Sequence, residues 1–186
     1  MTRLGVCLLL ALPLTAQDRA IDTERSTITI HVGKAGLFSA AGHEHWVDAP
    51  ISAGVVDESA PRAEFTVETA KMRVRPDPKV DAKTQVQIQK DMEDMTLDIA
   101  HYREIKFQSS RVEKTGDASW RVTGTLSLHG VSKPVAVEVS REGGAFSGKT
   151  ILKQTDFGIK PISVGGGAIK VKNEIDIEFK IFLRGA

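Results

Sequence analysis

Three histidines near the start of the chain are the residues best suited to metal chemistry. His31, His43 and His45 lie close together in sequence, and Glu44 separates the last two. In an extended segment, residues two apart share one face, so His43 and His45 would present two imidazoles side by side. Such a pair, with His31 or Glu44 as a third ligand, suits a transition metal. The alternative is that the three histidines are polar groups at the mouth of a pocket or hydrogen-bond to the backbone.

The other patterns that carry chemistry are missing from the sequence. There is no Gly-x-Ser-x-Gly nucleophile elbow and no HExxH metal motif. The glycine run at residues 165–167 precedes a predicted strand, whereas a phosphate-binding loop precedes a helix. We therefore expect no enzyme activity and no required cofactor, and a metal site on His43 and His45 is the less favoured interpretation.

The first sixteen residues have the pattern of a cleavable signal peptide. Arg3 is followed by an apolar run at residues 4–14, which is too short to span a bilayer. We expect cleavage after Ala16 and a periplasmic or secreted domain at residues 17–186. The single cysteine, Cys7, would be removed with the leader.

Charge and hydropathy exclude two classes of partner for this predicted domain. The whole chain carries a formal net charge of +1. Removing residues 1–16 takes away one arginine and no acidic residue, which leaves the charge near zero and gives no electrostatic basis for binding nucleic acid. No second apolar run is long enough for an integral membrane segment in the mature chain.

Alternation of apolar and polar residues runs through most of the chain. This period of two predicts half-buried strands at residues 26–32, 62–69, 120–128, 135–139, 145–155 and 169–183. Residues 43–57 are predicted to form a strand that is interrupted at Ala49–Pro50. Many strands without an internal repeat indicate a single all-β domain.

One substantial helix is predicted near residues 82–95. Asp81 is suited to cap it, and Ile88, Met92 and Met95 repeat at helical spacing, so we expect the two methionines to pack the helix against the sheet. A short helix or turn is expected near residues 34–41. The long, one-sided last strand favours a closed sheet, because closure removes an exposed edge. We therefore expect one extended antiparallel β-barrel of about eight strands, which has room inside for packed side chains or a small ligand.

Several segments resemble the YceI-like family. GTLSLHGVSKPV (residues 124–135) resembles its most recognisable motif, with a corner expected at residues 130–134 between two strands. LDIAHYREIKF (97–107), IKFQSSRVEKTGDASWRVTG (105–124) and QTDFGI (154–159) are similar to other segments of that family. The family is more aromatic where this chain has His43, Glu44 and His45, which suggests a more polar pocket entrance.

The resemblance implies a lipocalin-like barrel, exported to the periplasm, that holds an isoprenoid-type lipid such as a polyprenyl chain or a quinone without catalysing a reaction. The candidates for an apolar lining share alternation or apolar character within these segments and in the strand at 62–69: Phe65, Val67, Ile105, Phe107, Val122, Leu126, Leu128, Phe157 and Ile159. Each of them could equally fill a solid core, so a filled barrel that acts as a structural or interaction module remains an alternative. A homodimer also remains open.

Overall fold

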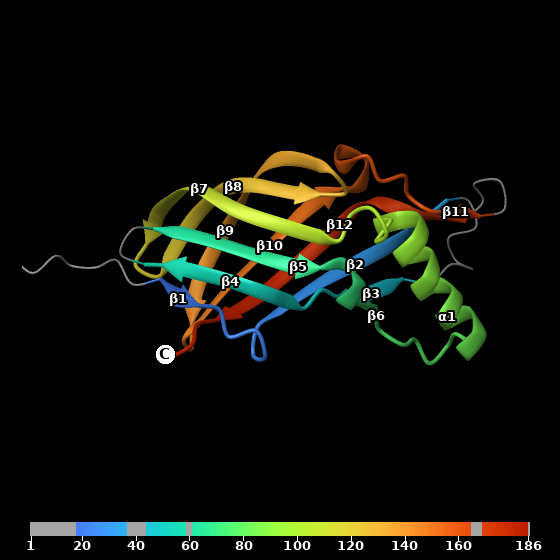
Figure 1. The fold of residues 1–186 in the computed structure, drawn as a ribbon, viewed down its shortest axis with the longest axis horizontal. Coiled ribbons are helices and arrows are strands. Elements are labelled where there is room, and N and C mark those ends of the chain that lie inside the picture. Colours follow the sequence, from blue (N-terminus) through green and yellow to red (C-terminus); the bar gives the residue numbers. More distant parts are fainter. Residues whose placement is uncertain (1–17, 37–43, 59–60, 165–168, 186) are drawn as a thin grey trace, which may run out of the picture.

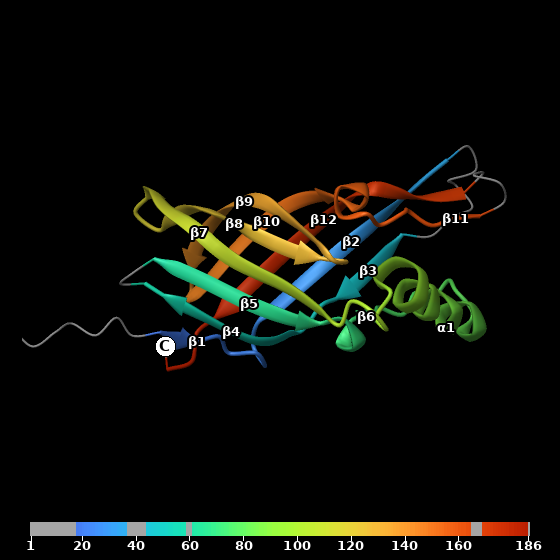
Figure 2. The same ribbon diagram turned by 45° about the horizontal axis from the view of Figure 1, so that its top comes forward.

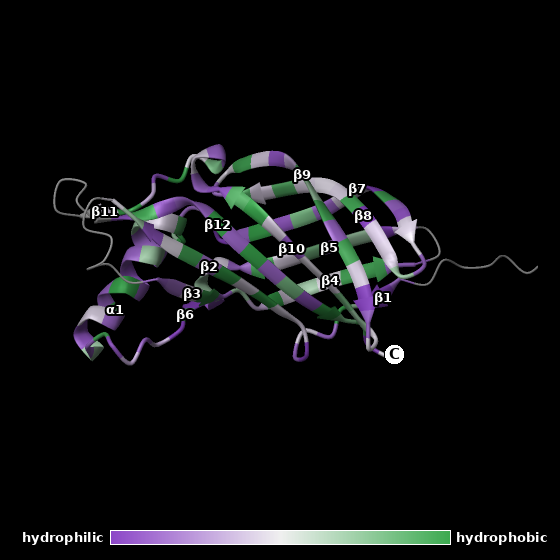
Figure 3. Ribbon diagram, turned by 180° about the vertical axis from the view of Figure 1, so that it is seen from behind, coloured by the Kyte–Doolittle hydropathy of each residue, from purple (hydrophilic) through white to green (hydrophobic). Residues whose placement is uncertain are grey.

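The chain forms one antiparallel sheet that curls into an elongated barrel, with a helix beyond one end (Figures 1 and 2). The computed structural model describes residues 18–36, 44–58, 61–164 and 169–185. The strands follow the period-two pattern, and Figure 3 shows hydrophobic and hydrophilic residues alternating along them. The expected all-β antiparallel barrel is confirmed.

Twelve strands make up the sheet in the described part of the chain. They are β1 (Arg19–Ala20), β2 (Thr27–Ala35), β3 (His45–Asp48), β4 (Ile51–Asp57), β5 (Arg62–Glu68), β6 (Arg73–Val74), β7 (Glu104–Gly116), β8 (Ser119–Leu128), β9 (Val131–Glu142), β10 (Ala145–Lys153), β11 (Ser163–Val164) and β12 (Ile169–Phe182). A 3-10 turn, Thr69–Lys71, follows β5, and a second one, Gln154–Phe157, follows β10.

The sheet closes because β3 and β4 form one run that is bent at Ala49–Pro50, as the sequence predicts. β3 pairs with β2, and β4 pairs with β5. From β5 the order runs through β7, β8, β9, β10 and β12 back to β2. Counting β3 and β4 as one run and setting aside the short β1, β6 and β11 gives the long strands of the barrel, so the expectation of about eight is met.

Residues 19–21 complete the wall at the end of the barrel away from the helix. β1 pairs with β4, and Ile21 forms a bridge with Leu183 just after β12. The Asp22 N–H donates to the Phe182 carbonyl at 2.8 Å. Ile21 and Leu183 are among the most buried side chains of the described residues, so this seam belongs to the core.

The predicted helix begins where expected but changes its winding. α1 (Ala82–Asp91) is capped by Asp81, whose carboxylate accepts from the Thr84 N–H at 3.0 Å. Residues Met92–Leu97 then form a π-helical segment. The wider turn moves Met95 out of phase with Met92, so Met95 is 65% exposed while Met92 is buried. The expected packing of both methionines is therefore wrong for Met95.

The corner of the 124–139 hairpin lies earlier than the sequence suggested. His129 (φ 52°) and Gly130 (φ 74°) form a two-residue turn, and Leu128 pairs with Val131. Two positive φ values suit such a turn because they match the twist of the flanking strands. Pro134 lies within β9, whose pairing with β10 covers Glu138–Glu142 and leaves this part of β9 as an edge, where a proline is tolerated.

The short helix or turn expected near residues 34–41 is not found where it can be checked. Lys34 and Ala35 continue β2, which pairs with β12 up to that point. Residues 37–41 lie outside the described residues.

Candidate functional site

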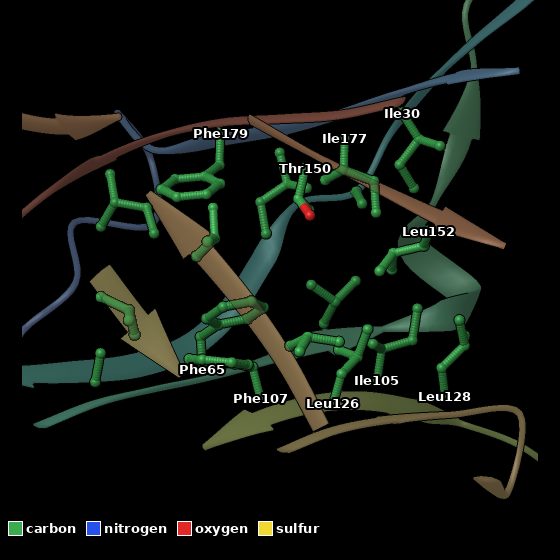
Figure 4. Close-up of a pocket in the computed structure, with 18 of the residues that line it drawn as sticks. Ile30, Phe65, Ile105, Phe107, Leu126, Leu128, Thr150, Leu152, Ile177 and Phe179 are labelled. Atoms are coloured by element: carbon green, nitrogen blue, oxygen red, sulfur yellow. The ribbon is translucent and has the colours of Figure 1, made fainter. Parts of the chain in front are cut away.

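A cavity of about 330 Å³ lies inside the barrel. That volume is at the lower end of the range of about 300–1,000 Å³ that small-molecule pockets occupy. Its wall comes from the inward faces of the long strands, and the π-helical segment covers the end next to α1. In Figure 4 apolar side chains surround the space from both sides. The cavity contradicts the filled-barrel alternative.

All nine residues named from the sequence as lining candidates border this cavity. Phe65 and Phe107 pair directly across β5 and β7, and their rings stack with centroids 5.4 Å apart. Phe157 and Ile159 reach the cavity from the turn after β10 and are nearly fully buried. That any of the nine contacts a ligand stays a prediction.

More residues line the cavity than the nine that the sequence pattern predicts. The inward faces of β2, β9, β10 and β12 also border the cavity, through Ile30, Val32, Val135, Val137, Val139, Phe146, Thr150, Leu152, Ile175, Ile177 and Phe179. The same period-two pattern identifies these positions once the sheet is known to close.

Two inward glycines give aromatic rings room to lie against the wall. A Cβ on Gly148 would be 2.5 Å from Cζ of Phe179, its cross-strand partner, and a Cβ on Gly124 would be 2.6 Å from Cζ of Phe107. Real Cβ atoms do not approach carbon that closely. The two glycines therefore keep Phe179 and Phe107 at the wall and out of the cavity centre.

A slot separates parts of β9 and β10. Their pairing extends from Ala145 and Glu142 to Lys149 and Glu138, and it does not continue to residues 150–153. Ala136 and Lys153, which alternate with inward residues, also border the cavity. The cavity therefore approaches the surface through this slot.

The cavity also approaches the surface at the β4–β5 end, among charged side chains that pair with one another. The Glu58 carboxylate accepts from Arg19 at 3.1 Å and from Arg141 at 2.8 Å. Arg62 donates to Asp18 at 2.7 Å, and the hydrogen bond to this carboxylate raises the pKa of Arg62. Cations and carboxylates thus pair with one another at this end.

His31 lies on the outer face of the barrel and does not point toward the pocket. It alternates with Ile30 and Val32, which border the cavity. Its Nδ1 lies 3.3 Å from Asp176, its Nε2 lies 3.2 Å from Glu44, and its ring stacks on Trp46 with centroids 4.5 Å apart. The expectation that His31 is a polar group at the pocket mouth is therefore corrected: strand alternation directs it outward.

His45 lies on the opposite face of the sheet from His31. It pairs with Val32 across β2 and β3, and cross-strand partners share a face. His45 and His31 therefore cannot bind the same metal ion. His43 lies outside the described residues. Within the described ranges, no three His, Cys, Asp or Glu side chains come together as metal ligands would.

Comparison with known proteins assigns the chain to a family. The model of the YceI-like domain matches residues 20–183. The chain belongs to the YceI-like family. The match covers every strand of the barrel from β2 to β12, including the cavity wall and the slot. Within the described residues, no helix is both long enough and apolar enough to span a membrane.

Relatives in this family include UPF0312 proteins of Pseudomonas. The protein of Pseudomonas savastanoi pv. phaseolicola is 37% identical over an alignment of 94 residues, and the match covers 45% of this chain and 47% of that protein. The protein of Pseudomonas putida W619 is 38% identical over 91 residues, 44% of this chain and 45% of the relative. Each match thus spans about half the length of the relative.

Solved structures of the same fold include two from other bacteria. BcnA of Burkholderia cenocepacia superposes with a TM-score of 0.58 at 19% identity, over 87% of this chain and 98% of that one. A polyisoprenoid-binding domain from Saccharophagus degradans gives a TM-score of 0.57 at 14% identity, over 88% of this chain and 96% of that one. At such low identity these likenesses establish the fold.

Proposed function

We propose that this YceI-like protein is an exported, non-enzymatic carrier that holds an isoprenoid-type amphiphile, such as a polyprenyl chain or a quinone, inside the barrel. The observation that carries the proposal is the cavity of about 330 Å³ with its almost wholly apolar wall. The description of the Saccharophagus degradans domain as polyisoprenoid-binding supports the ligand class. The pattern of residues 1–16 supports export.

The driving force for binding is the removal of an apolar chain from water. Burial of apolar surface contributes about 25 cal/mol per Å². The wall supplies branched aliphatic side chains and the stacked rings of Phe65 and Phe107, which suit a branched, unsaturated hydrocarbon. Most polar wall residues lie near the two places where the cavity approaches the surface, so the interior between them is suited to a hydrocarbon tail.

Filling the cavity tests the proposal. Leu126 points into the space in Figure 4, and Leu126→Trp would occupy part of it. Ile151 is 63% exposed on β10, so Ile151→Trp adds the same ring on the outer face as a matched control. A polyprenyl alcohol or a quinone should raise the melting temperature of the wild type and of the control, because ligand present at 100 times its Kd stabilises the folded state by about 2.7 kcal/mol.

We expect Leu126→Trp to abolish or strongly reduce this stabilisation. Leu126→Phe is a milder variant for use if the tryptophan prevents folding, since overpacking a core costs about 1–3 kcal/mol. Equal ligand effects on the filled variant and on the control would exclude the barrel interior as the binding site.

A further inference from the structure

We propose that Gln154 receives the head group of the bound lipid and that this head group is a neutral hydroxyl, as in an isoprenoid alcohol. The inference rests on the proposed function and adds the orientation and chemical class of the ligand. It places the polar end of the lipid at the slot between β9 and β10, with the tail running past Thr150 toward Phe65 and Phe107.

Gln154 is a buried amide whose carbonyl oxygen is left available to a ligand. It is 6% exposed and borders the cavity. Its Nε2 donates to the carbonyl of Lys172 at 2.8 Å, which fixes the amide nitrogen toward β12. Among the described residues, nothing donates to its Oε1.

The free oxygen of Gln154 is also accessible. No fully enclosed side-chain nitrogen or oxygen lacks a hydrogen-bond partner in the described part of the chain. The unpaired Oε1 therefore keeps accessible surface, and we infer that this surface faces the cavity, which Gln154 borders. A buried acceptor without a donor costs about 1–3 kcal/mol, so a ligand that brings a donor gains from pairing with it.

The turn that carries Gln154 is held firmly in place. The Thr155 N–H donates to Asn173 Oδ1 at 3.0 Å, and Asn173 Nδ2 donates to Thr155 Oγ1 at 2.9 Å. These bonds fix the turn Gln154–Phe157 to β12. The acceptor is therefore positioned in advance, at the edge of the slot where residues 150–153 of β10 have no partner in β9.

The charges around the cavity argue against an anionic head. Lys153, at the slot, lies 3.9 Å from Glu174, so its charge already has a partner. At the opposite end Arg19 and Arg141 are paired with Glu58. A phosphate would bring negative charge against the carbonyl oxygen of Gln154, whereas an alcohol donates its O–H to that oxygen.

Thr150 is the competing position for the head group. It lies on the inward face of β10, four residues before Gln154, which begins the 3-10 turn after that strand, and Figure 4 shows its hydroxyl oxygen directed into the cavity. The strand from Thr150 to Lys153 alone spans about 10 Å, so a single hydroxyl does not reach both side chains. Thr150→Val therefore serves as a matched variant that removes a different polar group from the same wall.

Three probes with one hydrocarbon skeleton separate the possibilities: geranylgeraniol, its methyl ether and geranylgeranyl phosphate. Trp120 borders the cavity, so quenching of its fluorescence reports binding to the purified protein. We expect the alcohol to bind about three- to tenfold more tightly than the ether, as one additional hydrogen bond allows. The phosphate should bind more weakly than the alcohol.

In Gln154→Met the alcohol-to-ether ratio should fall to about one, while Thr150→Val and Gln154→Glu, which keeps acceptor oxygens, should retain the preference. If Gln154→Met acted only by losing the hydrogen bond to Lys172, the affinities for the alcohol and for the ether would fall together and their ratio would not change. If Gln154→Met fails to fold, the alcohol-to-ether affinity ratios of the wild type and of Gln154→Glu test the assignment.

Equal binding of alcohol and ether by the wild type, tightest binding of the phosphate, or loss of the preference in Thr150→Val would each overturn the assignment of Gln154 while leaving lipid binding intact. Failure of all three probes to bind would refute the proposed function together with the inference.

Discussion

The ring of Phe179 lies against the backbone of Gly148, its partner across β10 and β12, so closely that a Cβ on Gly148 would be 2.5 Å from Cζ of the ring. The same Cβ would be 2.7 Å from the Glu138 carbonyl oxygen in β9. Because Gly148 has no side chain, the Phe179 ring can lie against the wall and not in the cavity. The shape of the cavity thus depends on strand positions without a side chain as well as on the side chains that line it.

We predict that Gly148→Ala destabilises the fold and narrows the cavity. The methyl group must displace either the Phe179 ring, into the cavity, or the backbone of β9, and overpacking of this kind costs about 1–3 kcal/mol. Urea unfolding measures the loss of stability, and lipid titration measures the loss of affinity. Gly116→Ala is the control, because its Cβ would meet nothing closer than Ser119 Cβ at 3.5 Å.

The double variant Gly148→Ala/Phe179→Leu tests the mechanism. Removing the ring relieves the clash, so the two substitutions should be less destabilising together than the sum of their separate effects. Additive effects would show that the ring of Phe179 is not what Gly148 accommodates.

A second prediction concerns the start of α1 and acid stability. The Asp81 carboxylate accepts from the Thr84 hydroxyl and from the Thr84 N–H, and both bonds lower the pKa of Asp81 from its usual value. The ionised form is thus favoured in the folded state. Its contribution is present above the pKa of the unfolded chain, near 4, and is lost as the pH falls through the lower folded value.

Asp81→Asn removes this titration and keeps an N-cap of similar quality. Stability of the variant, measured by urea unfolding, should therefore fall less steeply below pH 4 than that of the wild type. Parallel curves in this pH range would contradict the role assigned to the ionised Asp81.

The alternation of side chains allowed much of the fold to be predicted. Each strand with a clear period of two was found. Seven of the nine apolar candidates lie at the cavity wall because inward positions of a closed sheet face one interior, and the other two, Phe157 and Ile159, reach it from the turn after β10. What sequence could not give was register. His31 and His45 differ by an even number of residues, and whether they share a face depends on how β2 pairs with β3.

Other differences have equally local causes. The expected apolar stripe at Met92 and Met95 assumed a uniform helix, and a π-helical segment changed the phase. Pro134 suggested a corner, but that stretch of β9 is an edge and tolerates it. The slot beside Gln154 depends on where the pairing of β9 and β10 ends, and no periodic pattern in the sequence marks that point.

A third prediction addresses the histidines. His31 lies on the outer face, hydrogen-bonded to Glu44 and Asp176, whereas His45 lies on the opposite face, so His31 and the Glu44 carboxylate that it contacts are not placed to join His45 as metal ligands. Metal analysis of the wild type and of His43→Ala/His45→Ala should therefore give the same low content. A stoichiometric metal present in the wild type and lost in the double variant would establish the metal site instead.

A fourth prediction concerns the end of the barrel where Glu58 joins Arg19 to Arg141. Glu58→Gln should lower stability by about 1 kcal/mol or less, because exposed ion pairs contribute little. The loss should shrink at high salt, where surface charges are screened. A salt-independent loss, measured by urea unfolding, would show that Glu58 acts through packing.

The central claim is that the barrel carries an isoprenoid-type lipid. Mass spectrometry of an organic extract from natively purified protein tests it most directly, with Leu126→Trp prepared in parallel. We predict an isoprenoid alcohol or related isoprenoid amphiphile at close to one molecule per chain in the wild type and a strong depletion in the filled variant. Wild-type protein that yields no lipid, and whose melting temperature is unchanged by added polyprenyl or quinone compounds, would contradict the claim.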